Sequence, residues 1–338
     1  MPPLSEFDAW PKTVPYQVGD TLNLRIDGTQ DDGTRDKVVV RISRLVQPWT
    51  LSAVMVVDVL DAPSQHNIPP QAFLKLYDRR CFSPGKRKRW RVGLWTPERE
   101  QELLVFLRSG EAAEFLKRYR EDSDFDDDGS WSPAQNEATL SEEMYSIYET
   151  EVQAYASLAK HQGRHIPRLY AKVSLDIGPP HDRDTATDPA VAELFVVPGI
   201  LIEYVQGFRM SDLARNIDRS DWNRFVNRAV DVTRHILKDS DVINQDVRPD
   251  NMLVCRTAPG GEDDDDDAGR GYRFVMVDFG LCRFREEGET IEKWGLAKHR
   301  QDEEGAMGEV MKIKLREEAG FEADFKNPLT WIDYAERG

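Results

Sequence analysis

The stretch that most constrains the fold is SEEMYSIYETEVQAYASLAKHQG, which spans residues 141–163. Glu151 falls on the same face of the predicted helix as a set of apolar residues, and a carboxylate there is costly unless it meets a cation. Lys75, in a predicted strand, is the candidate partner. The apolar residues recur at helical spacing and define an inward face: Met144, Ile147, Tyr148, Tyr155 and Leu158.

Three strands are predicted before this helix. KVVVRIS (37–43) and SAVMVVDVL (52–60) are rich in β-branched residues and are joined by a short turn, which indicates a β-hairpin. QAFLKLYDRR (71–80) is the third strand. Because side chains alternate along a strand, Lys75 shares one face with Phe73 and Tyr77.

Mixed segments and further regular elements follow. The segment at about 82–140 is interpreted as a partly helical insertion with a basic cluster at 86–91. Two strands are expected near 167–176 and 194–205, then a helix capped by Ser220. The residues after Gly280 are expected to be mostly helical.

Two short polar motifs lie in the second half of the chain. In VINQDVRPDNMLV (242–254), Asp246 and Asn251 are five positions apart between two apolar runs. YRFVMVDFG (272–280) is a predicted strand that ends in Asp278, Phe279 and Gly280. Taken singly, Asp246 and Asn251 are also typical of turns beside a proline, and D-F-G alone occurs by chance in many chains.

The order of all these elements resembles the protein-kinase-like superfamily, whose signature is a third-strand lysine, a helix glutamate, a D-x-x-x-x-N loop and D-F-G. The segments NQDVRPDN, PWTLSAV and QGRHIPRLY are similar to those of divergent, minimal or fungal-type kinase-like proteins. The resemblance implies an α+β, bilobal fold. An antiparallel-sheet N-lobe with helix αC would span 1–205, and a reduced, mainly helical C-lobe would span 206–338.

The resemblance also implies site residues for ATP and Mg²⁺. Lys75, held by Glu151, would contact the α- and β-phosphates, and Asn251 and Asp278 would bind Mg²⁺. Asp246 would accept or orient the proton of the attacking hydroxyl, and Arg248 would supply positive charge near the γ-phosphate. The expected nucleotide-binding residues of the N-lobe are Ser52, Val54, Lys75, the gatekeeper Ile202, and the backbone of Glu203 and Val205.

Three departures keep a second interpretation open. The hairpin turn has Gln47, Trp49 and Ser52 where the family has three glycines that cover the phosphates. Asn244 and Gln245 replace the His-Arg that precedes the aspartate, and no A-P-E follows D-F-G. The function is therefore expected to be phosphoryl transfer to a protein or small-molecule hydroxyl, and the alternative is a pseudokinase, a non-catalytic interaction module.

Composition excludes other classes of function. A formal net charge of −16 opposes general binding of nucleic acid, because phosphate repels an acidic surface. The three cysteines have no metal-ligand spacing and fit a reduced compartment. The N-terminus does not resemble a secretory signal, and the longest apolar stretch is too short to span a bilayer. We expect a cytoplasmic protein without a membrane partner, with residues 86–91 as an alternative nuclear-import signal.

Overall fold

A computed structural model describes residues 15–27, 36–82, 94–122, 125, 131–177, 195–257 and 271–335. The chain divides into two compact units. Unit 1 contains residues 1–148 and 170–202, and unit 2 contains residues 149–169 and 203–338. The basic cluster 86–91 and nearly all of the acidic loop 259–271 lie outside the described residues.

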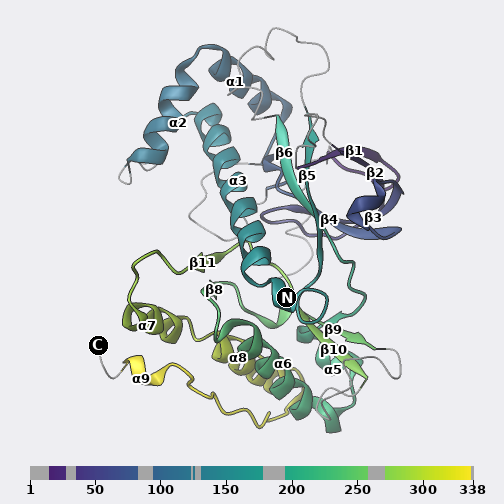
Figure 1. The fold of residues 1–338 in the computed structure, drawn as a ribbon, viewed down its shortest axis with the longest axis vertical. Coiled ribbons are helices and arrows are strands. Elements are labelled where there is room, and N and C mark those ends of the chain that lie inside the picture. The colour runs from purple at the N-terminus through teal and green to yellow at the C-terminus, as the bar shows by residue number, and fades with distance from the viewer. Residues whose placement is uncertain are drawn as a thin grey trace. The chain divides into compact units, whose positions relative to one another are not determined.

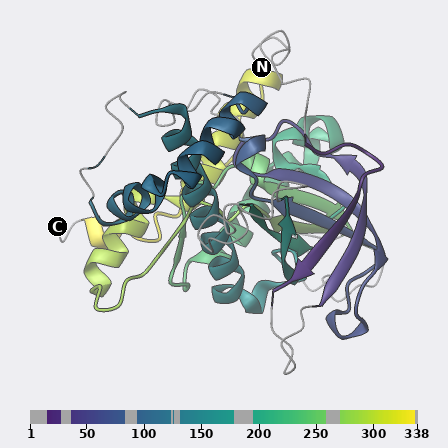
Figure 2. The ribbon, with the colours of Figure 1, turned by 90° about the horizontal axis from the view of Figure 1, so that it is seen from above.

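Unit 1 is built on an antiparallel sheet whose strands follow the order β1-β2-β3-β4-β6-β5 and close into a barrel (Figures 1 and 2). Alternate strand residues fill the barrel core, among them Leu24, Val40, Met55 and Leu74. The strands are β1 (Thr21–Ile26), β2 (Lys37–Leu45), β3 (Ala53–Asp61), β4 (Gln71–Leu76), β5 (Leu169–Asp176) and β6 (Val196–Ile202).

The α+β class and the N-terminal antiparallel sheet are confirmed, but the closure of the sheet differs from an open kinase-type N-lobe. Strand β1 causes the closure, because it pairs with β2 along one edge and with β5 along the other. Its alternating residues Leu22, Leu24 and Ile26 give it an apolar face that the barrel covers.

The insertion contains two helices, and the helix after it begins earlier than predicted. Helices α1 (Pro97–Arg108) and α2 (Glu111–Glu121) are separated at Gly110, whose positive φ of 80° suits glycine. Helix α3 (Pro133–Ser157) starts eight residues before the predicted 141 and includes residues at the end of the predicted insertion. Its residues up to Tyr148 belong to unit 1 and the rest to unit 2.

Unit 2 combines short strands with helices (Figure 1). Helix α6 begins at Trp222 with Asp221 at its N-cap, so the predicted Ser220 cap is wrong, and its buried face contains Phe225, Val226 and Ile236. The strands are β7 (Phe208–Arg209), β8 (Val242–Asn244), β9 (Met252–Arg256), β10 (Tyr272–Met276) and β11 (Cys282–Phe284). The helices are α5 (Leu213–Asn216), α6 (Trp222–Leu237), α7 (Ile291–Gln301), α8 (Glu303–Ala319) and α9 (Ile332–Ala335).

No helix among these described segments combines the length and hydrophobicity that crossing a lipid bilayer requires.

Candidate active site

The D-x-x-x-x-N loop of unit 2 is closed by hydrogen bonds between its own ends. Asn251 donates through Nδ2 to the Asp246 carbonyl oxygen at 2.9 Å and to the Asp246 carboxylate at 3.1 Å. The Arg248 guanidinium lies 3.3 Å from the same carboxylate. The loop therefore places a carboxylate, an amide and a guanidinium around one point.

Backbone contacts bring the D-F-G segment to this loop. The Val277 N–H donates to the Asn251 carbonyl oxygen at 2.9 Å, which places Asp278 beside the metal-ligand asparagine of the prediction. Strands β8 and β11 pair on the other side, with Asn244 opposite Cys282. Unit 2 thus brings together Asp246, Arg248, Asn251 and Asp278.

The Asn244 side chain connects the D-x-x-x-x-N loop to the D-F-G segment. Its Oδ1 accepts the Asp246 N–H at 2.9 Å, and its Nδ2 donates to the Asp278 carbonyl oxygen at 3.5 Å. The side chain is completely buried, so these contacts are shielded from water. The asparagine that replaces the expected histidine therefore braces the loop.

Asp278 has an unusual backbone conformation. Its φ of 69° lies in the left-handed region, which aspartate tolerates better than most residues. The next residue, Phe279, is fully buried and meets the Tyr155 ring edge-to-face at 5.6 Å between centroids. Packing of Phe279 thus offsets the conformational cost at Asp278.

Carboxylates gather around the end of α3 in unit 2. Glu151 is buried, as the helical spacing indicated. Burial raises the pKa of the Tyr155 hydroxyl, and the charges of Glu151, Asp278 and Glu203 raise it further. Burial also raises the pKa of the Cys282 thiol, with contributions from Glu151, Glu303 and Asp278. These electrostatic effects place Glu151 and Asp278 close to both Tyr155 and Cys282.

A buried ion pair that the sequence did not reveal supports the loop. Lys298 donates to the carbonyl oxygens of Leu237 and Val242 at 2.9 and 2.5 Å, and to the Glu303 carboxylate at 2.9 Å. Glu303 in turn accepts the Asn244 N–H at 2.7 Å. Burial lowers the pKa of Lys298 and raises that of Glu303, while their mutual attraction opposes both shifts. The pair ties α6, α7 and α8 to β8.

In unit 1, the predicted nucleotide-binding residues lie on neighbouring strands. Lys75 on β4 is opposite Val54 on β3 and Ile200 on β6, and Phe73 is opposite Ile202. The Lys75 side chain is buried, with Nζ 5.5 Å from the centre of the Tyr77 ring. Lys75, Val54 and Ile202 are therefore brought to one part of the barrel.

The glycine-free turn before β3 is folded inward. Trp49 is 1% exposed, packs in the barrel core and donates from Nε1 to the Val54 carbonyl oxygen at 3.1 Å. Ser52 is also buried, at the start of β3. Trp49, which stands where the kinase-like family has a glycine, is thus a core residue of the barrel.

The segment after β6 is anchored within unit 2. The Glu203 carboxylate pairs with Arg273 at 2.7 Å and accepts the Arg168 N–H at 3.2 Å. Val205 packs with Cys255 and Val275 in a small apolar cluster. These contacts explain why Glu203 and Val205 hold fixed positions in the unit.

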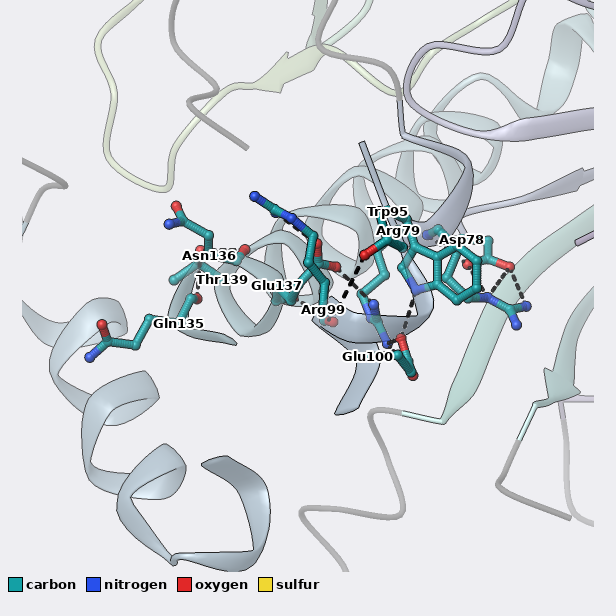
Figure 3. A network of polar contacts seen from close by, with 12 residues as sticks. Asp78, Arg79, Trp95, Arg99, Glu100, Gln135, Asn136, Glu137 and Thr139 are labelled. Carbon is teal, nitrogen blue, oxygen red and sulfur yellow. Dashed lines mark hydrogen bonds and ion pairs between the residues drawn. The ribbon is translucent and has the colours of Figure 1, made fainter. Parts of the chain in front are cut away.

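A buried polar network fixes the insertion to the end of β4 (Figure 3). Arg79 donates to both oxygens of Glu100 on α1 at 2.8 and 2.7 Å, and to Glu137 on α3 at 2.8 Å. Arg99 adds a second contact to Glu137 at 3.3 Å, and Trp95 donates to Glu100 at 2.7 Å. Arg79 and Glu137 are both nearly inaccessible to water.

The residue before Arg79 belongs to a second buried cluster in the same unit. Asp78 accepts hydrogen bonds from Arg80 and from the Tyr16 hydroxyl, which lies 2.6 Å away. Burial alone would raise the pKa of Asp78, but the charge and hydrogen bonds of Arg80, together with the Tyr16 bond, outweigh it and lower that pKa. The end of strand β4 is therefore held by two ionic clusters.

The residues present fit a magnesium ion bound together with a nucleotide. Asn251 directs Nδ2 toward Asp246, which leaves Oδ1 as an acceptor, and Asp278 provides a carboxylate. Mg²⁺ is commonly held by one or two protein oxygens, with phosphates and water completing its shell. Among the described residues, no group of three or more His, Cys, Asp or Glu side chains is arranged to hold a metal ion.

No protein-family model matches the chain, and no curated protein matches it either.

Proposed function

We propose that the protein is an ATP- and Mg²⁺-dependent phosphotransferase of the protein-kinase-like type. The observation that carries the proposal is the hydrogen bond between Asn251 and Asp246 in unit 2, beside which the Val277 N–H bond to the Asn251 carbonyl oxygen places Asp278. Two carboxylates and an amide oxygen in one region are the groups that phosphoryl transfer from ATP requires.

In this proposal each side chain has a definite task. Asp246 orients the acceptor hydroxyl and receives its proton, while Asn251 holds the Asp246 carboxylate in place. Arg248 balances negative charge that develops on the transferred phosphoryl group. When bound, Mg²⁺ would neutralise the phosphates from its position on Asn251 and Asp278. Lys75 with Glu151 would contact the α- and β-phosphates, and the backbone of Glu203 and Val205 would receive the adenine.

Radiolabelled γ-phosphate transfer or slow ATP hydrolysis tests this proposal. We expect Asp246→Asn to lower the rate by about 10²–10⁴-fold, the usual contribution of a positioned base, and Asp278→Ala to abolish it. Asp250→Asn is a matched control, because Asp250 lies in the same loop but is exposed and bonds to Ser211. Equal rates in all four proteins would refute the enzymatic proposal.

One observation favours a non-catalytic module as the second candidate function. The Asp246 carboxylate is already paired with Arg248, and Trp49 is buried where a phosphate-covering loop needs glycine. A thermal-shift titration separates the two functions, because a ligand that binds only the folded state raises its stability. Absence of stabilisation by ATP and Mg²⁺ at millimolar concentration would favour the module.

A further inference from the structure

Unit 2 contains a cavity of about 320 Å³ that the proposed reaction does not use. The C-terminal ends of α6 and α7, the first turn of α8 and the segment 329–331 line it. A volume of this size is at the lower end of the range for small-molecule sites. The cavity can therefore accommodate a small molecule rather than a folded partner.

The carboxylates that line the cavity are already hydrogen-bonded within the protein. Asp302 accepts the Gly305 N–H at 3.1 Å and the Asn327 amide at 2.7 Å. Glu303 is bound to Lys298 and to the Asn244 N–H. Glu304 accepts from the Thr330 hydroxyl at 2.8 Å and pairs with Arg234 at 3.3 Å. Glu303 and Glu304 are thus paired with cations, whereas Asp302 bonds to neutral amide groups and keeps its negative charge.

The exposed cations at the same cavity have no such partners. Lys238 and Arg300 line it and are solvent-exposed, and the half-buried His299, between Lys298 and Arg300 in the chain, lines it as well. Within the described part of the chain, none of these three side chains forms an ion pair or a side-chain hydrogen bond. Trp331 adds an aromatic surface. Lys238 and Arg300 together outweigh Asp302, so the net charge left uncompensated at the cavity is positive, although the chain as a whole carries −16.

We infer that this cavity is a binding site for a small phosphate-bearing ligand. Two unpaired cations match the charge of a phosphate dianion better than that of a single carboxylate. The fork of the Arg300 guanidinium suits phosphate oxygens, and Lys238 supplies a second point charge. His299 provides a further ring nitrogen for a hydrogen bond.

The same cavity is connected to the catalytic loop. Lys298 and Glu303 line it, and they contact the Val242 carbonyl oxygen and the Asn244 N–H. Asn244 accepts the Asp246 N–H. A phosphate near this ion pair changes its electrostatic environment, so the ligand acts on the loop that positions Asp246. This regulatory step depends on the proposed phosphotransfer, whereas occupancy of the cavity does not.

The test uses inorganic phosphate as the probe and the melting temperature as the readout, with sodium chloride added to equalise ionic strength. We expect phosphate at millimolar concentration to raise the melting temperature of the wild type, and acetate to have a smaller effect. The double variant Lys238→Ala/Arg300→Ala should lose the phosphate effect. The matched control is Lys293→Ala/Lys326→Ala, which removes two exposed cations of unit 2 that do not line the cavity and should keep the effect.

A phosphate effect that is absent in the wild type, or equal in both double variants, would overturn the site, and an acetate effect as large as that of phosphate would overturn the ligand class. Hydrogen exchange then tests the coupling. Bound phosphate should slow exchange of the Asn244 amide more than that of Val275, and equal slowing would overturn the regulatory step. A wild type that binds phosphate but transfers none from ATP would refute the proposed function and leave the site intact.

Discussion

Asn244 illustrates how much of the candidate site depends on one buried amide. It accepts the Asp246 N–H, donates to the Asp278 carbonyl oxygen and receives support from Glu303 through its own N–H. Its side chain therefore connects the proposed base, Asp246, to the proposed metal ligand, Asp278. In the proposed reaction it contacts neither the phosphate nor the acceptor.

Replacing this amide should weaken both stability and turnover. Asn244→Ala leaves the Asp246 N–H without its acceptor, and a lost buried partner costs about 1–3 kcal/mol. Urea denaturation measures that cost. Asn227→Ala is the control, because the Asn227 amide donates to carbonyl oxygens at an exposed position of α6. Its effect should stay within about 0.5 kcal/mol, and an equal loss in the two variants would contradict the assigned role.

Three histidine rings predict a pH dependence of stability. His161, His165 and His235 lie with ring centroids 5.1–6.3 Å apart. Burial lowers the pKa of His161 to about 4, and the charges of His235, Lys160 and Arg164 add to this effect. Burial likewise lowers the pKa of His165 to about 4, with His235, Arg164 and Arg228 contributing.

The pKa values of His161 and His165 in the folded protein fall below that of an unfolded histidine, about 6.5. Between about pH 4 and about pH 6.5 the unfolded chain therefore binds more protons than the folded protein. The stability that neutral His161 and His165 contribute is fully present above pH 6.5 and is lost as the pH falls toward 4. We expect the double variant His161→Gln/His165→Gln to lose less free energy of unfolding than the wild type over this interval. Parallel pH profiles in urea denaturation would contradict the assignment.

At the scale of single elements, the predicted strands and loops follow from local patterns. The hairpin 37–60 and the Lys75 strand are predicted by alternation of apolar residues over a few positions. The turn at Pro249 is predicted by the proline and its polar neighbours. Strand β1 has the same alternation, but its role in closing the barrel depends on pairing with β5, which is far along the chain. Likewise, Arg79 and Glu137 are 58 positions apart in the sequence, and no local pattern predicts their contact.

The turn before β3 gives a prediction about a single element. Trp49 belongs to the barrel core, so Trp49→Gly removes a large buried side chain and should destabilise the protein by about 3–5 kcal/mol. The glycine should not increase the affinity for ATP, because the turn loses the packing that holds its fold. Gln47→Gly is the control for added flexibility without a lost core residue. A Trp49→Gly protein with unchanged stability would contradict this interpretation.

The Arg79 network gives a second prediction at this scale. Arg79→Ala leaves Glu100 and Glu137 without their main cation, and removing one partner of a buried pair costs about 3–5 kcal/mol. Arg99 retains one contact to Glu137, so we expect the lower end of that range. Arg120→Ala is the matched control, since Arg120 joins α2 to Glu142 on α3 at the surface. Its cost should be at most about 1 kcal/mol, and similar losses would disprove the central role of Arg79.

At the scale of the whole molecule, charge sets the response to salt. At a net charge of −16, the excess negative side chains repel one another and destabilise the folded state. Salt weakens this repulsion, because the screening length shortens from about 30 Å at 0.01 M salt to about 8 Å at 0.15 M. We expect the melting temperature to rise over this interval in sodium chloride. A falling melting temperature would show that the ion pairs of the surface outweigh the overall repulsion.

The three cysteine thiols, two buried and one half-buried, have a practical consequence for studying each unit by chemical labelling. Burial is the main cause that raises the pKa of Cys81 in unit 1 and of Cys255 and Cys282 in unit 2. Alkylating reagents attack the thiolate, so the folded protein should react slowly at pH 8. Because the cysteines are divided between the units, mass spectrometry of the alkylated peptides would report which unit opens first under denaturant, without any engineered probe.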